Sequence, residues 1–162
     1  VIFTSDHGLA IGSHGLMGKQ NMYDHTIRVP FIISGPSIAK GQRTGAFGYL
    51  RDMYPTTCEL ANITIPKTVQ AKSLVSILTG KAKSVHSYGY GYFRDAQRMI
   101  RDERWKLIYY PNQKKYQFFN VEKDPHELTD LAGSPTHSAE VKRLRRLLLV
   151  WFHDQGDELF LK

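Results

Sequence analysis

The sequence predicts an α/β protein that continues into a small antiparallel sheet with one C-terminal helix. Two apolar runs rich in branched residues, 1–4 and 29–36, lead into glycine-containing loops, as buried strands of a sheet often do. Three strand-like runs separated by polar turns occupy 98–121 and indicate an antiparallel meander. An apolar stripe at helical spacing follows from residue 135 and predicts a helix.

The first half contains short elements joined by loops. The run 1–4 is expected to be a buried strand of a parallel sheet, and 29–36 a second strand. Between them, 21–28 predicts a short helix or turn. Pro55 suits the first turn of a helix within 51–63, and 71–81 predicts a short helix or loop that Gly80 terminates. Cys58 is expected to be a buried thiol of the helix in 51–63.

From residue 84 the pattern changes, so the predicted division is 1–83, the end of an α/β domain, and 84–162, a small α+β subdomain. Within 98–110 two strands flank the turn at Asp102 and Glu103, and 116–121 forms a third. The alternating aromatic residues of 87–93 favour a packed strand. Ser134-Pro135 offers a helix start, and the stripe that packs this helix on the meander is Val141, Leu144, Leu148, Trp151 and Phe152.

Composition restricts the classes of partner. The net charge of +7 lies mainly in the first half, where 9 basic and 4 acidic residues give +5, against 13 and 11 giving +2 after residue 83. This balance suits an anionic substrate, but without a dense basic run we expect no nucleic-acid partner. No apolar run approaches the roughly 18 residues of a membrane helix, so we expect no membrane partner. The lone Cys58 cannot form an intrachain disulfide, and the compartment stays open.

The loop that follows the first apolar run carries candidate ligands. Reactive groups of open α/β sheets gather beyond the carboxyl ends of strands, and Asp6 and His7 come directly after 1–4. A carboxylate beside an imidazole can ligate a metal, and Lys19, beyond a glycine-rich loop, can approach an oxyanion as a point charge. In the alternative interpretation Asp6 caps a turn and His7 is a solvated loop residue.

An ordered succession of motifs resembles the C-terminal part of the sulfatases, within the alkaline-phosphatase-like superfamily. The motifs are S-D-H-G (5–8), G-S-H-G (12–15), G-K (18–19), Y-D (23–24) and R-V-P (28–30). The segments 51–66, 73–80, 98–110 and 118–133 are similar to the family's later motifs. The likeness therefore covers nearly the whole chain and implies the C-terminal portion of an alkaline-phosphatase-like sulfatase fold.

The resemblance implies roles for individual residues. Asp6 and His7 correspond to ligands of a divalent cation, usually calcium, although imidazole leaves manganese and zinc as candidates. Lys19 corresponds to the catalytic lysine that contacts the sulfate ester. The nucleophile of the family, a hydrated formylglycine, belongs to a C/S-x-P-S-R motif that this sequence lacks, and Cys58 does not match it. We therefore expect the nucleophile upstream, in a longer polypeptide.

The other polar residues near the loop have weaker assignments. His14 lies between the predicted metal ligands and Lys19, so it either contacts the leaving group of the substrate or only packs in the loop. His25 is expected to be structural, bonded near the start of the second strand. Arg28, Arg51 and Asp52 are expected to form internal ion pairs or turns.

The resulting hypothesis is a sulfuric ester hydrolase that acts on a sulfated small molecule or carbohydrate, together with the remainder of the same polypeptide. This chain alone is expected to be inactive. The alternatives are a phosphodiesterase or phosphonate monoester hydrolase of the same superfamily, and a non-catalytic fragment that keeps the fold without the reaction. Periplasmic, secreted and lysosomal locations are all compatible with the resemblance.

Overall fold

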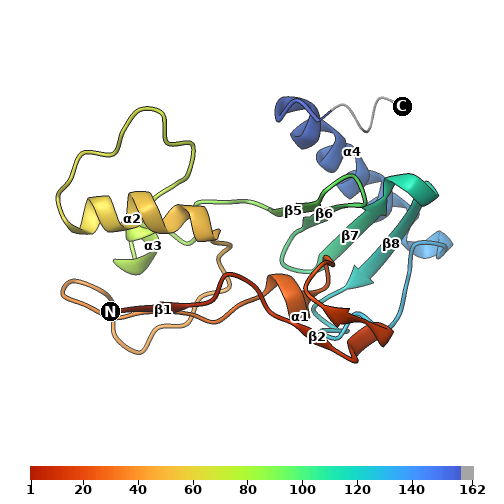
Figure 1. Cartoon of the computed structure of the whole chain (residues 1–162), viewed down its shortest axis with the longest axis horizontal. Helices are drawn as coiled ribbons and strands as arrows, with labels where there is room; N and C mark the ends of the chain where they lie inside the picture. Colours follow the sequence, from red (N-terminus) through yellow and green to blue (C-terminus); the bar gives the residue numbers. More distant parts are fainter. Residues whose placement is uncertain (158–162) are drawn as a thin grey trace. The chain divides into compact units, whose positions relative to one another are not determined.

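The structure is a computed structural model that describes residues 1–157, and its elements divide into two compact units (Figure 1). The first unit contains residues 1–6 and 30–87, and the second contains residues 7–29 and 88 onward. The predicted division at 83/84 lies close to the last of these boundaries but did not group 7–29 with the second half. Those residues belong there because Met22 and Tyr23 pack in a core with Met99, Ile108 and Phe119. As a division of a larger catalytic domain, 1–83 and 84–162 stays a prediction.

The first unit contains a two-stranded sheet and short helices. Strand β1 (Ile2–Thr4) pairs antiparallel with β4 (Phe31–Ile33), with Ile2 opposite Ile33. A 3-10 turn, η2 (Leu50–Asp52), leads into α2 (Met53–Leu60), and α3 (Val75–Leu78) follows after a loop. Both predicted helices and both predicted strands are present, and Cys58 is buried in α2 as expected.

The prediction that 1–4 is a buried strand of a parallel sheet is wrong for the described residues. Strand β1 is antiparallel to its partner, and Phe3 keeps 59% of its surface exposed. Among residues 1–157 only β4 pairs with β1, so apolar side chains of β1 are not covered from a second strand. Composition indicates that such a run can be buried, but it does not encode the direction of the neighbouring strand.

Buried Asp52 organises the turn into α2. Its carboxylate accepts hydrogen bonds from the backbone N–H of Tyr49 (2.9 Å) and Lys72 (3.0 Å), and from His86 Nε2 (2.7 Å). Asp52 is therefore an internal, paired residue, as predicted.

The second unit is built around a four-stranded antiparallel sheet in the order β5-β6-β7-β8. The strands are β5 (Gly89–Phe93), β6 (Gln97–Arg101), β7 (Trp105–Tyr110) and β8 (Lys115–Asn120), and a 3-10 turn, η3 (Pro111–Gln113), joins the last two. The predicted meander is confirmed, and β5 is the strand predicted for the aromatic segment 87–93. Helix α4 (Ser138–Asp154), preceded by η4 (Pro135–His137), confirms the predicted C-terminal helix.

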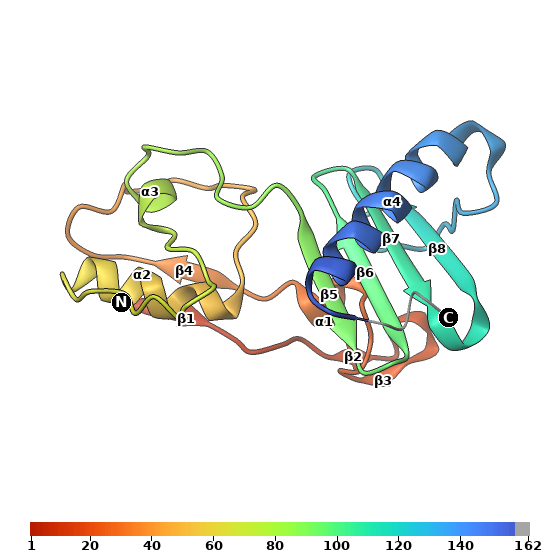
Figure 2. The same ribbon diagram turned by 90° about the horizontal axis from the view of Figure 1, so that it is seen from above.

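Both faces of this sheet are covered (Figure 2). Helix α4 lies across one face, where Leu144, Leu148 and Phe152 pack on Ile100, Leu107 and Phe118. The segment 7–29 covers the other face through the Met22–Tyr23 cluster. Successive strand residues point to opposite faces. A sheet covered twice therefore explains why every residue of 98–100 and 105–108 is buried, including Arg98 and Lys106.

Segment 7–29 is a compact excursion of the chain. It contains the hairpin of β2 (Ala10–Ile11) and β3 (Met17–Gly18), the 3-10 turn η1 (Ser13–Gly15) between them, and helix α1 (Asp24–Ile27). Helix α1 confirms the short helix predicted within 21–28. No helix among residues 1–157 has the length and apolar character needed to cross a membrane.

Candidate substrate and metal site

The β2–β3 hairpin and the residues that flank it include those that the sequence singled out. Lys19 follows β3 directly, and His14 lies in the η1 turn at the other end of the hairpin. Gly8 anchors the entry to this segment, because its N–H donates to Thr26 O at 2.7 Å. A Cβ atom at Gly8 would lie 2.1 Å from His25 O, so only glycine allows this close approach of the two backbones.

The structure brings His7 and Lys19 into contact. Lys19 Nζ lies 2.7 Å from His7 Nε2, and His7 Nδ1 lies 2.9 Å from Gly8 O. A carbonyl only accepts, so Nδ1 carries the hydrogen and Nε2 offers its lone pair to the lysine ammonium. The residue predicted to ligate a metal and the residue predicted to contact the ester thus lie side by side.

Asp6 and His7 are donor types found in divalent-cation sites, but in this arrangement Lys19 takes the Nε2 lone pair of His7, so the imidazole could ligate a metal only after the lysine releases it. A metal-ligating histidine usually donates its other ring N–H to a carbonyl or carboxylate, and His7 does so toward Gly8 O. Asp6, the adjacent residue, supplies carboxylate oxygens, one of which lies 3.5 Å from Ser5 Oγ. Within residues 1–157 no three His, Cys, Asp or Glu side chains gather as a metal cluster. Calcium takes six to eight oxygen ligands, so these residues alone do not complete its site.

His14 makes contacts of another kind. Its Nε2 donates to His126 O at 3.0 Å, and its ring stacks on Tyr23 with centroids 3.9 Å apart. Its backbone adopts φ 56°, in the left-handed region. His14 is therefore held between Tyr23 and the chain around His126.

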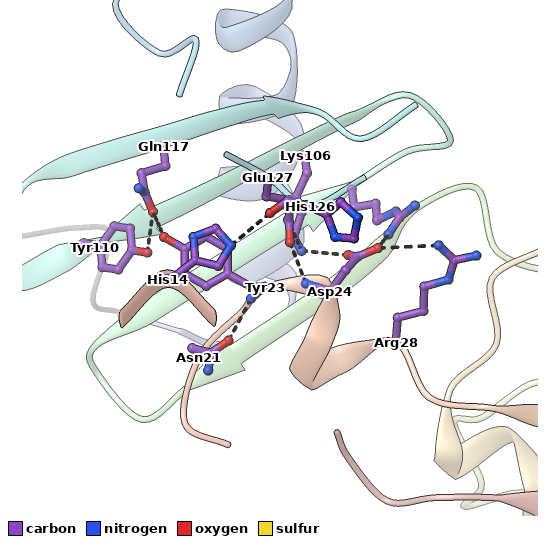
Figure 3. A network of polar contacts seen from close by, with 11 residues as sticks. His14, Asn21, Tyr23, Asp24, Arg28, Lys106, Tyr110, Gln117, His126 and Glu127 are labelled. Atoms are coloured by element: carbon purple, nitrogen blue, oxygen red, sulfur yellow. Dashed lines mark hydrogen bonds and ion pairs between the residues drawn. The ribbon is translucent and has the colours of Figure 1, made fainter. Parts of the chain in front are cut away.

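A buried ionic network fixes α1 against the sheet (Figure 3). The Nζ atom of fully buried Lys106 lies 2.9 Å from Asp24 Oδ1 and 2.5 Å from Glu127 Oε1. Glu127 also accepts the N–H of Asp24 at 2.6 Å, and Arg101 donates to Asp24 Oδ2. Burial raises the pKa of the Asp24 carboxyl, but Lys106 and Arg101 outweigh it and leave that pKa below its usual value.

A second set of polar contacts holds Tyr23, the ring under His14. The hydroxyl of Tyr23 donates to Gln117 Oε1 at 2.8 Å, and Tyr110 donates to the same oxygen at 2.6 Å (Figure 3). Burial, with the Tyr23 hydroxyl next, raises the pKa of Tyr110 well above its usual value. The Tyr110 hydroxyl therefore stays protonated, and the hydrogen bond to Gln117 fixes Tyr23 to β8.

Sequence reasoning did not identify Lys106, Glu127 or Tyr110 as parts of this arrangement. Lys106 and Glu127 lie within segments that resemble family motifs, but a motif does not indicate which residues pair across about 80 or more positions. The alternation of the strands could have placed Lys106 on the same face as Met99 and Ile108, opposite the face covered by α4.

The prediction that His25 is bonded is not met in the described residues. Its Nε2 is buried and has no hydrogen-bond partner among residues 1–157. Burial, followed by nearby His14 and Lys106, lowers the pKa of His25 below its usual value. Arg28 lies 4.0 Å from Asp24 but is 71% exposed, so its predicted ion pair is present at the surface and is not internal. Arg51 lies in the turn η2, as predicted, with its guanidinium over the Tyr49 ring.

Solved structures define the class of this fold. The chain superposes with a TM-score of 0.87 on a structure described as bound to its substrate D-glucosamine-2-N,6-O-disulfate, at 26% identity over 96% of this chain and 34% of that one. A phosphonate monoester hydrolase from Silicibacter pomeroyi matches with a TM-score of 0.83 at 26% identity, over 98% of this chain and 35% of the other. The fold is the C-terminal portion of the alkaline-phosphatase-like sulfatase fold, as predicted.

The sequence comparison identifies the family. The family model described as N-sulphoglucosamine sulphohydrolase, C-terminal, matches residues 12–152. An arylsulfatase from Clostridium perfringens is 32% identical over 155 residues, which cover 91% of this chain and 32% of the relative. The chain therefore belongs to the family that this model defines, the C-terminal part of N-sulphoglucosamine sulphohydrolase. It spans about a third of the length of this relative, and the matched range includes His14 and Lys19 but begins after Asp6 and His7.

Proposed function

We propose that this chain forms the C-terminal part of a sulfatase that hydrolyses sulfate esters of saccharides. The observation that carries the proposal is the 2.7 Å contact between Lys19 and His7, which unites the two predicted roles at one point of the segment 7–29. Family membership supports the reaction class, and the relative bound to D-glucosamine-2-N,6-O-disulfate supports a sulfated saccharide as substrate.

In the proposed reaction Lys19 contacts the sulfate oxygens. Cleavage of the ester S–O bond leaves an alcohol and spreads negative charge over the sulfate oxygens and the leaving oxygen. A fixed cation directed at this charge lowers the barrier to the reaction. The lysine ammonium acts as a compact point charge, and in this structure it lies on His7 Nε2. Because that nitrogen has one lone pair, His7 would ligate a cation only once Lys19 has turned from it toward the sulfate oxygens.

Asp6 and His7 are the proposed ligands of a divalent cation, with Ca²⁺ as the first candidate and Mn²⁺ or Zn²⁺ as alternatives. Such an ion would supply Lewis-acid polarisation of the ester oxygens. The remaining ligands and the nucleophile, by resemblance a hydrated formylglycine, are proposed to come from a preceding part of the same polypeptide.

A phosphonate monoester hydrolase is the second candidate, because one such enzyme shares this fold at 26% identity. The test is a substrate panel with the complete polypeptide that contains this chain: a sulfated glucosamine, an aryl sulfate and an aryl phosphonate. We expect kcat/KM for the sulfate esters to exceed that for the phosphonate by at least tenfold. Preference for the phosphonate would establish the second candidate, and no turnover of any ester would support the non-catalytic alternative.

A further inference from the structure

The ring nitrogen that Lys19 contacts is the atom of His7 through which the imidazole would ligate a metal. His7 Nδ1 lies 2.9 Å from Gly8 O and carries the hydrogen, so the in-plane lone pair of the ring is at Nε2. Lys19 Nζ lies 2.7 Å from that nitrogen. A cation and the lysine ammonium both need this one lone pair, so they exclude each other at His7.

The histidine is the fixed member of this pair. It is half-buried, and its ring is oriented by Gly8 O. Gly8 is held in turn by the 2.7 Å hydrogen bond from its N–H to Thr26 O, and it passes so close to the backbone of His25 that no side chain fits there. The backbone that orients the imidazole is thus fixed by contacts that do not involve Lys19.

Lys19 is the member that can move. The residue is exposed, and its four-carbon stem carries the ammonium on rotatable bonds. It follows Gly18, which has φ 99° and where an added Cβ atom would meet nothing within 4 Å. Contacts of exposed lysine side chains contribute little to stability, so a competing cation can displace the ammonium from His7.

The two proposed ligands of the site compete for opposite ends of this contact. Sulfate oxygens carry negative charge, whereas His7 Nε2 offers a neutral lone pair, so the Lys19 ammonium prefers sulfate once both are within reach. Sulfate that draws Lys19 away frees the His7 nitrogen for a cation. A cation on His7 frees Lys19 for sulfate. By thermodynamic linkage each ligand then strengthens the binding of the other by the same factor.

We infer that Lys19 is a switch that couples the divalent cation to the sulfate ester. It covers the nitrogen of His7 when the site is empty, and it turns to the sulfate when the cation binds. The inference rests on the proposed function, because it takes the ligand role of His7 and the sulfate contact of Lys19 from there. It adds that the cation and the ester bind cooperatively, and that the empty site is blocked by its own lysine.

The first test is nuclear magnetic resonance of the 162-residue chain without any metal. We expect a nuclear Overhauser effect between the ε-protons of Lys19 and the ring protons of His7, which the 2.7 Å contact requires. Inorganic sulfate should weaken this signal, and sodium chloride at the same ionic strength should leave it unchanged. Absence of the signal, or an equal response to both salts, would overturn the inference.

The second test is isothermal titration of the complete polypeptide with calcium, after its metal has been removed with a chelator. Without sulfate, Lys19→Met should bind calcium roughly three- to fivefold more tightly than the parent, the order of one exposed ionic contact. Metal content at saturating calcium should not change, because only the affinity depends on the competition. Arg28→Met removes an exposed cation of the same segment 7–29 and should keep the parental affinity.

The same titration with inorganic sulfate present separates the switch from simple attraction between the two ions. Sulfate should tighten calcium binding by the parent clearly more than by Lys19→Met, and Lys19→Gln should repeat the result with a different side chain. Equal tightening in parent and variants, or equal affinities without sulfate, would overturn the switch. Hydrolysis of sulfate esters with such equal affinities would retain the proposed function alone. Coupled binding without any hydrolysis would retain the switch and refute the proposed function.

Discussion

Lys106 Nζ and Asp24 Oδ1 lie 2.9 Å apart although 82 positions separate the two residues along the chain. The lysine comes from β7 in the middle of the sheet, and the aspartate begins α1, which follows the hairpin with Lys19. The pair therefore ties the segment of the candidate site to the rigid part of the second unit, and Glu127 completes the charge balance.

The first prediction concerns this buried lysine. Lys106→Met leaves two carboxylates, Asp24 and Glu127, without their central cation, so it should destabilise the chain by about 3–5 kcal/mol. The measurement is urea denaturation followed by circular dichroism. The control is Arg104→Met, which removes the exposed pair with Glu122 and should cost less than about 1 kcal/mol. Equal effects of the two substitutions would show that the network adds nothing to an ordinary surface pair.

The second prediction is a pH dependence that arises from Asp24. The pKa of this carboxyl is lower in the folded state than its ordinary value of 3.8. At pH values between these two pKa values, the unfolded chain therefore binds more protons than the folded chain. The contribution of Asp24 is therefore complete above about pH 4–5 and is lost as the pH falls through the folded pKa.

Asp24→Asn should remove this pH-dependent contribution to stability. Below about pH 4, the free energy of unfolding of the variant should therefore fall less steeply with decreasing pH than that of the parent chain. Urea denaturation at several pH values between 7 and 2 measures the two slopes, with exposed Asp154→Asn as the control. Parallel curves for the parent chain and Asp24→Asn would contradict the assignment.

The third prediction concerns Lys19 in the complete polypeptide. Lys19→Ala should lower kcat/KM for a sulfate ester by roughly 10²–10³-fold, the usual loss when one oxyanion-stabilising donor is removed. Lys19→Arg should restore part of the activity, since a planar guanidinium places its charge differently. The metal content should not change, because the lysine is not a ligand. Lys40→Ala, at another exposed lysine, should behave as the parent. Parental kcat/KM in Lys19→Ala would make this lysine an ordinary loop residue.

The fourth prediction concerns metal binding by the chain itself. With only Asp6 and His7 as proposed ligands, isothermal titration of the 162-residue chain should detect calcium binding only weaker than micromolar. The same chain should release no sulfate from an aryl sulfate. In the complete polypeptide, Asp6→Ala should abolish both metal binding and activity, whereas His153→Ala should affect neither. A micromolar calcium site in the isolated chain would refute the proposed division of ligands.

The sequence was a reliable guide where local patterns decide structure. The spacing of Leu144, Leu148 and Phe152 predicts one face of α4, and Pro55 indicates the beginning of α2. These features depend on helical periodicity and on the missing N–H of proline, which act over a few residues. The direction of β1 was predicted wrongly because strand pairing depends on residues about 30 positions away.

The candidate site was predictable only in part for a related reason. Motifs single out His7 and Lys19, but their contact depends on the hairpin that brings them together. The pairing of Asp24 with Lys106 and the meeting of His14, His25 and His126 depend on the register of β7 and on the loop after β8. Such contacts between distant residues leave no periodic signal in a single sequence.

The assignment of 7–29 to the second unit means that the chain passes from one unit to the other three times, at 6/7, 29/30 and 87/88. A single proteolytic nick between Ser87 and Tyr88 would therefore leave two covalent links between the units, yet the second unit would then consist of two separate polypeptides. Its integrity would depend on noncovalent complementation between Met22, Tyr23 and Asp24 on one fragment and the sheet on the other. Mixing fragments 1–87 and 88–162 tests this complementation. We expect Lys19 to take an ordered position only after the two fragments reassemble.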